Sequence, residues 1–278
     1  MAKAGGKRGY EILEINDIKT QYIERNHLWD SIYGERKAGI VNHFKLKDHK
    51  DSIFEVDVLK DTIAQNTVIY KKIIELDDKN VGYLVFNSFL KNSYQELDSA
   101  FADFKRHRIR ELILDLRYNS GGELYVANHL ANLIAGSLFC GEVMGRIEFN
   151  HTKSFYNNTF HFEDLPFSIE PDRIVVITSK ATASASEYLI NVLRPYMEMV
   201  LIGEKTHGKP VGGRGYRFKD KVINLICFRI TNSNGISDYF NGLNGDVSRI
   251  DDLCPDFGGP QYEGCNDYLV ITRPDVIE

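Results

Sequence analysis

The sequence predicts an α/β fold, with a parallel-rich sheet and flanking helices, preceded by a smaller β-rich unit. From about Val68 onward, short apolar runs typical of buried strands alternate with stretches of helical length. The first 65 residues instead show short alternating segments and little helix. The length of 278 residues suits one large domain or two modest ones, with enough chain to bury an apolar core.

Residues 1–65 are predicted to form the β-rich unit. Residues 10–16 alternate between apolar and polar side chains, as a half-buried strand does, and end in an Asn-Asp turn signal. Residues 40–46 and 53–59 alternate in the same way, and a short helix is expected over residues 21–33. The unit begins abruptly with a strand, as expected of a domain whose first part is missing.

Residues 66–278 are predicted to form the α/β unit. Ser93, with Glu96 three residues later, is a capping-box pattern that starts a helix. The expected strands are 81–86, 111–116, 173–178 and 199–203, the expected helices are 93–107, 123–135 and 184–196, and the segments beyond residue 203 look β-rich.

The composition excludes several classes of protein. Hydrophobic residues make up 43% and charged residues 26% of the chain, which is ordinary for a globular protein. The net charge is −5 with both signs interspersed, so no nucleic-acid binding is predicted. No apolar run reaches about 18 residues, so no membrane span is predicted. Residues 1–10 are basic and Gly-rich and lack the apolar stretch of a signal peptide.

Histidine and cysteine spacing predicts neither a metal site nor a cofactor. The eight histidines form no HExxH pattern, and the four cysteines match no metal-ligand spacing. Cys140 and Cys227 lie in apolar segments and are expected to be buried. Cys254 and Cys265 flank a Pro/Gly-rich loop and are either free or joined in a disulfide, which would imply an oxidising compartment.

Three turns that follow predicted strands carry candidate chemistry, because α/β folds bind ligands at such turns. In residues 115–122 (DLRYNSGG), Gly121 and Gly122 would let backbone N–H groups approach a ligand at a helix start. The simpler interpretation of this segment is a Gly-rich connection between a strand and a helix.

The second turn, residues 179–187 (SKATASASE), places Ser184 between a strand and a helix. A serine there is a candidate nucleophile, with backbone N–H groups nearby to stabilise an oxyanion. Ser184 and Glu187 also form a capping-box pattern, so a purely structural helix cap explains the same residues.

The third turn, residues 203–210 (GEKTHGKP), contains Lys209 between a glycine and a proline. A surface lysine is the simpler interpretation, since a lysine acts as a base only when it is deprotonated. His207 would share a face with Lys209 in an extended strand. Together the three turns supply a nucleophile, a base and oxyanion donors, which are the parts that acyl transfer needs.

These segments resemble the motifs of the S41 peptidases, the tail-specific or C-terminal processing serine proteases. The resemblance rests on residues 115–122, 182–187 (TASASE) and 206–209 (THGK), and it covers about residues 68–252. It implies that Ser184 is the nucleophile and Lys209 the base, and their separation of 25 residues agrees with the family's spacing.

The mechanism expected from the resemblance is peptide hydrolysis by a Ser-Lys dyad without a cofactor. The backbone N–H of Ala185, with that of Gly121 or Gly122, would hold the oxyanion. Arg117 is expected to order the Gly-Gly loop rather than to meet a substrate carboxylate. The resemblance further implies a ClpP/crotonase-like core, a protein or peptide substrate, and a location in the periplasm or otherwise outside the cytoplasm.

Two departures from the family pattern are evident. Residues 1–65 look like part of the PDZ domain that usually precedes the catalytic core, with the peptide-carboxylate-binding loop expected upstream of Met1. Many members also have a glutamine four residues after the base, where this sequence has Gly213. The unit is then a dyad, or His207 or another group takes the glutamine's place.

Two other classes of function fit parts of the sequence. A catalytically impaired peptide-binding or scaffold homologue would explain the missing glutamine and PDZ elements. A crotonase-like acyl-CoA enzyme would share the Gly-rich oxyanion loop, but the Ser184/Lys209 pair argues against it. Neither the substrate preference nor the oligomeric state is predicted.

Overall fold

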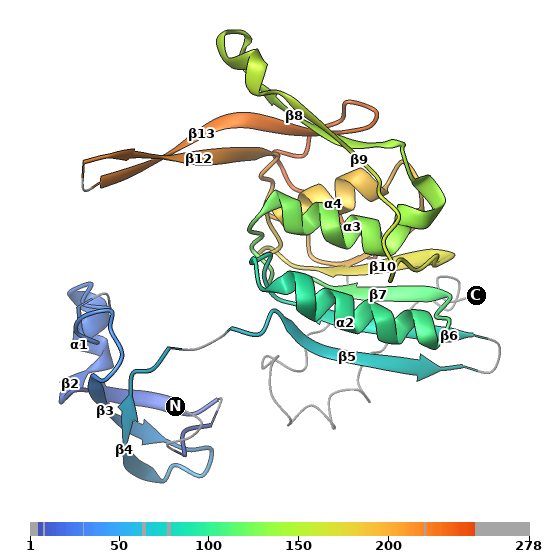
Figure 1. Ribbon diagram of the computed structural model, residues 1–278. Helices are drawn as coiled ribbons and strands as arrows, with labels where there is room; N and C mark the ends of the chain where they lie inside the picture. Colours follow the sequence, from blue (N-terminus) through green and yellow to red (C-terminus); the bar gives the residue numbers. More distant parts are fainter. Residues whose placement is uncertain are drawn as a thin grey trace. The chain divides into compact units, whose positions relative to one another are not determined.

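The computed structural model describes residues 5–7, 9–29, 31–62, 65–76, 79–219 and 221–247. These residues fall into two compact units, divided between Gln65 and Asn66 (Figure 1). The predicted Cys254–Cys265 pair lies outside the described residues.

The first unit is a four-stranded antiparallel sheet with one short helix. Its apolar core consists of Ile15, Ile23, Phe44 and Leu46. The three predicted strands are confirmed, but the helix is shorter than expected because His27 adopts a left-handed backbone with φ +55°. The elements are β1 (Glu11–Ile15), β2 (Ile18–Lys19), α1 (Thr20–Arg25), β3 (Val41–Lys47) and β4 (Ile53–Leu59), in sheet order β2-β1-β3-β4.

The second unit contains a central five-stranded sheet in the order β11-β10-β7-β6-β5. Four neighbouring strands run parallel, as the sequence predicts, and β5 is antiparallel to β6 at the edge. The sequence analysis did not identify β5, whose residues are largely exposed. The strands are β5 (Val68–Glu75), β6 (Asn80–Phe86), β7 (Glu111–Asp115), β10 (Arg173–Thr178) and β11 (Glu198–Gly203).

Three helices follow strands of this sheet: α2 (Ser93–Arg106), α3 (Leu124–Phe139) and α4 (Ala185–Leu193). The predicted capping box at the start of α2 is wrong. Asn92 is the N-cap, and the Ser93 hydroxyl donates to the carbonyl of Ser88. Glu96 accepts hydrogen bonds from the backbone N–H groups of Thr67 and Val68, at 2.7 and 2.8 Å, where the fold brings the start of β5 beside it.

A second sheet lies on the other side of α3 and α4 (Figure 1). Apolar side chains of both sheets and of the helices between them form one continuous core. The β-rich segments predicted beyond residue 203 are confirmed as β12 and β13, whereas β8 and β9 were not predicted. The elements are β8 (Val143–Phe149), the 3₁₀ helix η2 (His151–Tyr156), β9 (Asn158–His161), β12 (Val211–Phe218) and β13 (Lys221–Asn232), in sheet order β12-β13-β8-β9.

The prediction that Cys140 is buried is also wrong. Cys140 is the C-cap residue of α3 and is exposed, because the helix ends there and the chain turns back toward β8. Cys227 is half-buried.

Candidate active site

Ser184 lies in the turn between β10 and α4 and is the N-cap of the helix. Its backbone has φ +56° and ψ −114°, a region that only glycine adopts without strain. Ser184 is half-buried, so its hydroxyl is not enclosed by the core. A serine held in a strained turn between a strand and a helix is the local geometry of an activated nucleophile.

Glu187 fixes this turn and connects it to the segment that contains Lys209. One carboxylate oxygen accepts hydrogen bonds from the backbone N–H groups of Ser184 and Lys209, at 2.9 and 2.8 Å. The other accepts from the backbone N–H of Gly208 and the hydroxyl of Thr206, both at 2.6 Å. Because Glu187 is fully buried, its four bonds form a rigid junction between the two segments.

The predicted bond from Glu187 back to its own helix N-terminus is thus confirmed. Its bonds to residues 206–209 were not predicted, because no local sequence pattern indicates contacts about 20 residues away. The Thr206 hydroxyl also accepts a hydrogen bond from the backbone N–H of Leu243, at 2.7 Å, so its own proton is directed at Glu187.

The structure brings the backbones of Ser184 and Lys209 together but does not join their side chains. The Lys209 side chain is exposed, and within the described residues its amino group makes no hydrogen bond. His207 does not share an extended strand with Lys209, because Gly208 between them has φ +93°. Gly213 lies in β12 opposite Ile226 of β13.

The Gly-Gly turn lies directly against the serine. A Cβ atom added to Gly121 would lie 2.9 Å from the Cβ of Ser184 and 2.9 Å from the backbone nitrogen of Ala185, so only glycine fits. The N–H of Gly121 donates to the side-chain oxygen of Asn119 at 2.9 Å. In the described part of the chain, the N–H groups of Gly122 and Ala185 have no hydrogen-bond acceptor.

Asn119 joins the Gly-Gly turn to the serine turn, a role that the sequence analysis did not identify. Its carbonyl accepts hydrogen bonds from the Ala183 N–H and the Ser186 hydroxyl, at 3.2 and 2.9 Å. Its side-chain amide donates to the carbonyl of Phe86 at 3.0 Å. Ser186 is fully buried by this arrangement, which supports a structural rather than a nucleophilic role.

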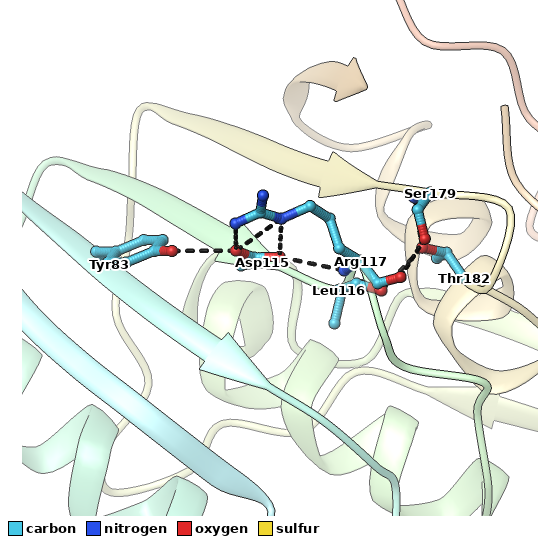
Figure 2. Close-up of polar contacts among 6 residues, drawn as sticks. All are labelled: Tyr83, Asp115, Leu116, Arg117, Ser179 and Thr182. Carbon is cyan, nitrogen blue, oxygen red and sulfur yellow. Dashed lines mark hydrogen bonds and ion pairs between the residues drawn. The ribbon is translucent and has the colours of Figure 1, made fainter. Parts of the chain in front are cut away.

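Asp115 and Arg117 form a buried ion pair at the base of the Gly-Gly loop, with 2.7 Å between Nη2 and Oδ2 (Figure 2). Tyr83 donates to the same carboxylate at 3.0 Å. Burial, together with the negative charge of Asp115, raises the pKa of Tyr83 and keeps its hydroxyl protonated. These contacts support the expected loop-ordering role of Arg117.

Two hydroxyl groups connect this loop to the serine turn. The hydroxyl of Thr182 donates to the carbonyl of Leu116 at 2.8 Å, and that of Ser179 donates to the carbonyl of Arg117 (Figure 2). The Gly-Gly loop and the serine turn therefore form one hydrogen-bonded frame, in which open backbone N–H groups lie beside a strained serine. A partly exposed hydroxyl beside backbone N–H donors is an arrangement that serine hydrolases use.

Residues 80–248 match the model of peptidase family S41, and the chain belongs to this family. It is 30% identical over 207 residues to a carboxyl-terminal-processing protease of a Picosynechococcus strain, covering 74% of this chain and 47% of that relative. It is 27% identical over 209 residues to the carboxy-terminal processing protease CtpA of Bacillus subtilis, covering 74% of this chain and 41% of that relative. The chain therefore spans about half, or less, of the length of these curated relatives.

Solved structures share the fold. A Bacteroides fragilis protein described as an S41 protease superposes with a TM-score of 0.70 at 25% identity, covering 90% of this chain and 68% of that one. The photosystem II D1 C-terminal processing protease gives a TM-score of 0.58 at 18% identity, covering 91% of this chain and 66% of that one.

Two further findings concern the described residues alone. No three or more histidine, cysteine or acidic side chains cluster there as metal ligands would. None of the helices there combines the length and the apolar character that crossing a bilayer requires.

Proposed function

We propose that this chain is a serine endopeptidase that hydrolyses peptide bonds, near the C-termini of unfolded or tagged proteins, with Ser184 as nucleophile and Lys209 as base. The Ser184 oxygen attacks the peptide carbonyl carbon while its proton passes to the neutral amine of Lys209. That proton then goes to the leaving amine, which yields an acyl-enzyme. Water, activated by the same amine, hydrolyses the ester and restores the serine hydroxyl.

The observation that carries this proposal is the strained backbone of Ser184 beside the N–H groups of Ala185 and Gly122, which have no acceptor among the residues that the structure describes. The oxyanion would be held by Ala185 together with Gly121 or Gly122, and such donors contribute about 3–4 kcal/mol each to the transition state. The engagement of the Gly121 N–H by Asn119 favours Gly122 as the second donor.

The position of Lys209 sets a requirement on catalysis. Its backbone is held next to Ser184 through Glu187, while its side chain is exposed to water. A polypeptide lying over the lysine would exclude water, and desolvation favours the neutral amine that a base requires. Substrate binding would therefore complete the dyad.

The test compares Ser184→Ala, Lys209→Ala and the control Ser186→Ala in hydrolysis of an unfolded protein substrate. The first two variants should abolish cleavage without changing the circular dichroism spectrum, and labelling by a serine-reactive phosphonate should map to Ser184. Full activity in Ser184→Ala would refute the assignment.

A peptide-binding homologue without turnover is the second candidate. Two features favour it: Gly213 stands where many family members have a glutamine, and the Lys209 amino group makes no hydrogen bond to any other residue that the structure describes. Retained peptide binding by a chain that shows neither cleavage nor phosphonate labelling would establish this alternative.

We also propose that residues 1–65 belong to a PDZ-like domain and that residues 66–278 form a catalytic domain with a ClpP/crotonase-like core. The small antiparallel sheet with one helix supports the first assignment. We further infer a location outside the cytoplasm, as the family resemblance implies. A thiol count under denaturing conditions tests whether Cys254 and Cys265 are free or joined in a disulfide, and a disulfide would agree with this location.

A further inference from the structure

The β12–β13 hairpin continues beyond the sheet to which it belongs. Only residues 228–232 of β13 pair with β8, so in the described structure the outer part of the hairpin is a two-stranded ribbon. Figure 1 shows this ribbon projecting past helices α3 and α4. Such ribbons are marginally stable in water unless something packs against them.

One face of this ribbon extends the apolar core outward. Ile230 and Phe228 face the core, and Gly212 is paired with Phe228. Side chains alternate along β12, and cross-strand partners share a face. On β13 the alternation shifts by one residue at a bulge, because Gly212 pairs with Phe228 and the next residue, Gly213, pairs with Ile226. The same face therefore carries Arg214, Tyr216 and Phe218 of β12, paired with Leu225, Ile223 and Lys221 of β13, and we call these six residues the inner face.

The inner face is apolar yet uncovered. Tyr216, Phe218, Ile223 and Leu225 are 47%, 64%, 51% and 50% exposed. The Arg214 guanidinium lies over the rings of Phe149 and Tyr156, at 5.0 and 4.9 Å from their centroids. The end of the inner face that is nearest to β8 therefore packs against aromatic side chains. An apolar surface of this kind marks a binding surface.

The hairpin is also continuous with the candidate active site. Strand β12 begins at Val211, two residues after Lys209, whose backbone is bonded to Glu187 beside Ser184. Within the described sheet β12 is the edge strand, so its outward N–H and C=O groups are available to pair with an added strand.

We propose that the inner face and the free edge of β12 bind an extended apolar segment of the substrate polypeptide, adjacent to the bond that is cut. This inference rests on the proposed function. Residues 213–226 contain four basic residues and one acidic residue, so a bound segment carrying acidic side chains is preferred over one carrying basic side chains.

The hairpin itself provides a matched control. Val222 and Ile226 are 60% and 70% exposed but lie on the opposite face, because their cross-strand partners are Arg217 and Gly213. Ile223→Ser/Leu225→Ser removes apolar surface from the inner face, and Val222→Ser/Ile226→Ser removes similar surface from the other face. All four side chains are at least half exposed, so both double variants should fold.

The experiment measures binding by fluorescence anisotropy in the full chain carrying Ser184→Ala, so that it does not depend on cleavage. The probes are unstructured peptides rich in Leu and Phe, flanked by either Glu or Lys. The inner-face variant should weaken binding at least about tenfold, because apolar contact is lost, and the control variant should leave it within about twofold. The Glu-flanked peptide should bind more tightly than the Lys-flanked one, and the difference should shrink as salt is added.

Equal losses in both double variants, or no loss in either, would overturn the docking proposal. So would a change in sedimentation confined to the inner-face variant, which would identify the occupant as a second copy of the chain. Failure of the proposed function is seen separately, as an absence of cleavage by the chain with Ser184 intact. A full binding contrast without cleavage would leave the docking surface established and refute the peptidase mechanism.

Discussion

Replacing Glu187 by glutamine tests whether this carboxylate assembles the site. Glutamine has nearly the same shape but only one accepting oxygen, whereas four donors point at the carboxylate. In its best orientation the amide oxygen faces the N–H groups of Ser184 and Lys209. The amide NH₂ then faces Thr206, which can accept, and the N–H of Gly208, which cannot.

The magnitude follows from these contacts. One buried donor left without a partner costs about 1–3 kcal/mol, and the bonds that remain lose the benefit of a charged acceptor, so we expect Glu187→Gln to lower the free energy of unfolding by about 2–4 kcal/mol. The cleavage rate of the folded protein should also fall, because the backbones of Ser184 and Lys209 are no longer held by one buried charge. Urea denaturation measures the first effect and cleavage of an unfolded protein substrate the second.

Glu96→Gln is the matched control. Glu96 also accepts four hydrogen bonds, from Thr67 (two), Val68 and Asn92, but it holds the edge of the central sheet rather than the candidate site. Its replacement should reduce stability while leaving the activity of the folded protein unchanged. The reasoning is refuted if Glu187→Gln stays within about 0.5 kcal/mol of wild type, or if both variants lose the same fraction of activity.

Three further predictions follow from single contacts. Gly121→Ala should abolish activity and lower the melting temperature, because its Cβ would lie 2.8 Å from the Ala183 carbonyl oxygen. The control Gly235→Ala should keep full activity, because Gly235 also has a positive φ but no atom outside the adjacent residues lies within 4 Å of the added Cβ. Asp115→Asn removes the charged acceptor that the Arg117 guanidinium and the Tyr83 hydroxyl share, and should lower the free energy of unfolding in urea denaturation by about 1.5–3 kcal/mol. A loss below about 0.5 kcal/mol would contradict this account. The hydrogen bond to Asp57 raises the pKa of His43, so its stabilisation is complete below about pH 6.5 and is lost as pH rises through the folded-state pKa. NMR titration should find that Asp57→Asn returns this pKa toward its ordinary value, and an unchanged pKa would exclude the contact.

Features that depend on short-range geometry could be predicted from the order of the residues. The alternation of strands and helices after Val68 predicted the central sheet, because buried strands and helices each leave a recognisable pattern of apolar residues in the sequence. The serine turn was predicted because Ser184 and Glu187 stand three residues apart, within reach of one helix end. The two glycines were identified as a close-approach turn, and Gly121 does lie against Ser184.

The distant groups that those residues contact depend instead on how the elements pack in three dimensions. Glu187 reaches Thr206 and Lys209, because α4 and the segment after β11 pack together, and no local spacing specifies that contact. At the start of α2 the local pattern predicted the wrong partner, since Glu96 accepts from the backbone N–H groups of Thr67 and Val68 instead of from that of Ser93. Buried hydrogen-bonding groups bond to the partners that lie next to them, and the packing of the whole fold sets which partners those are.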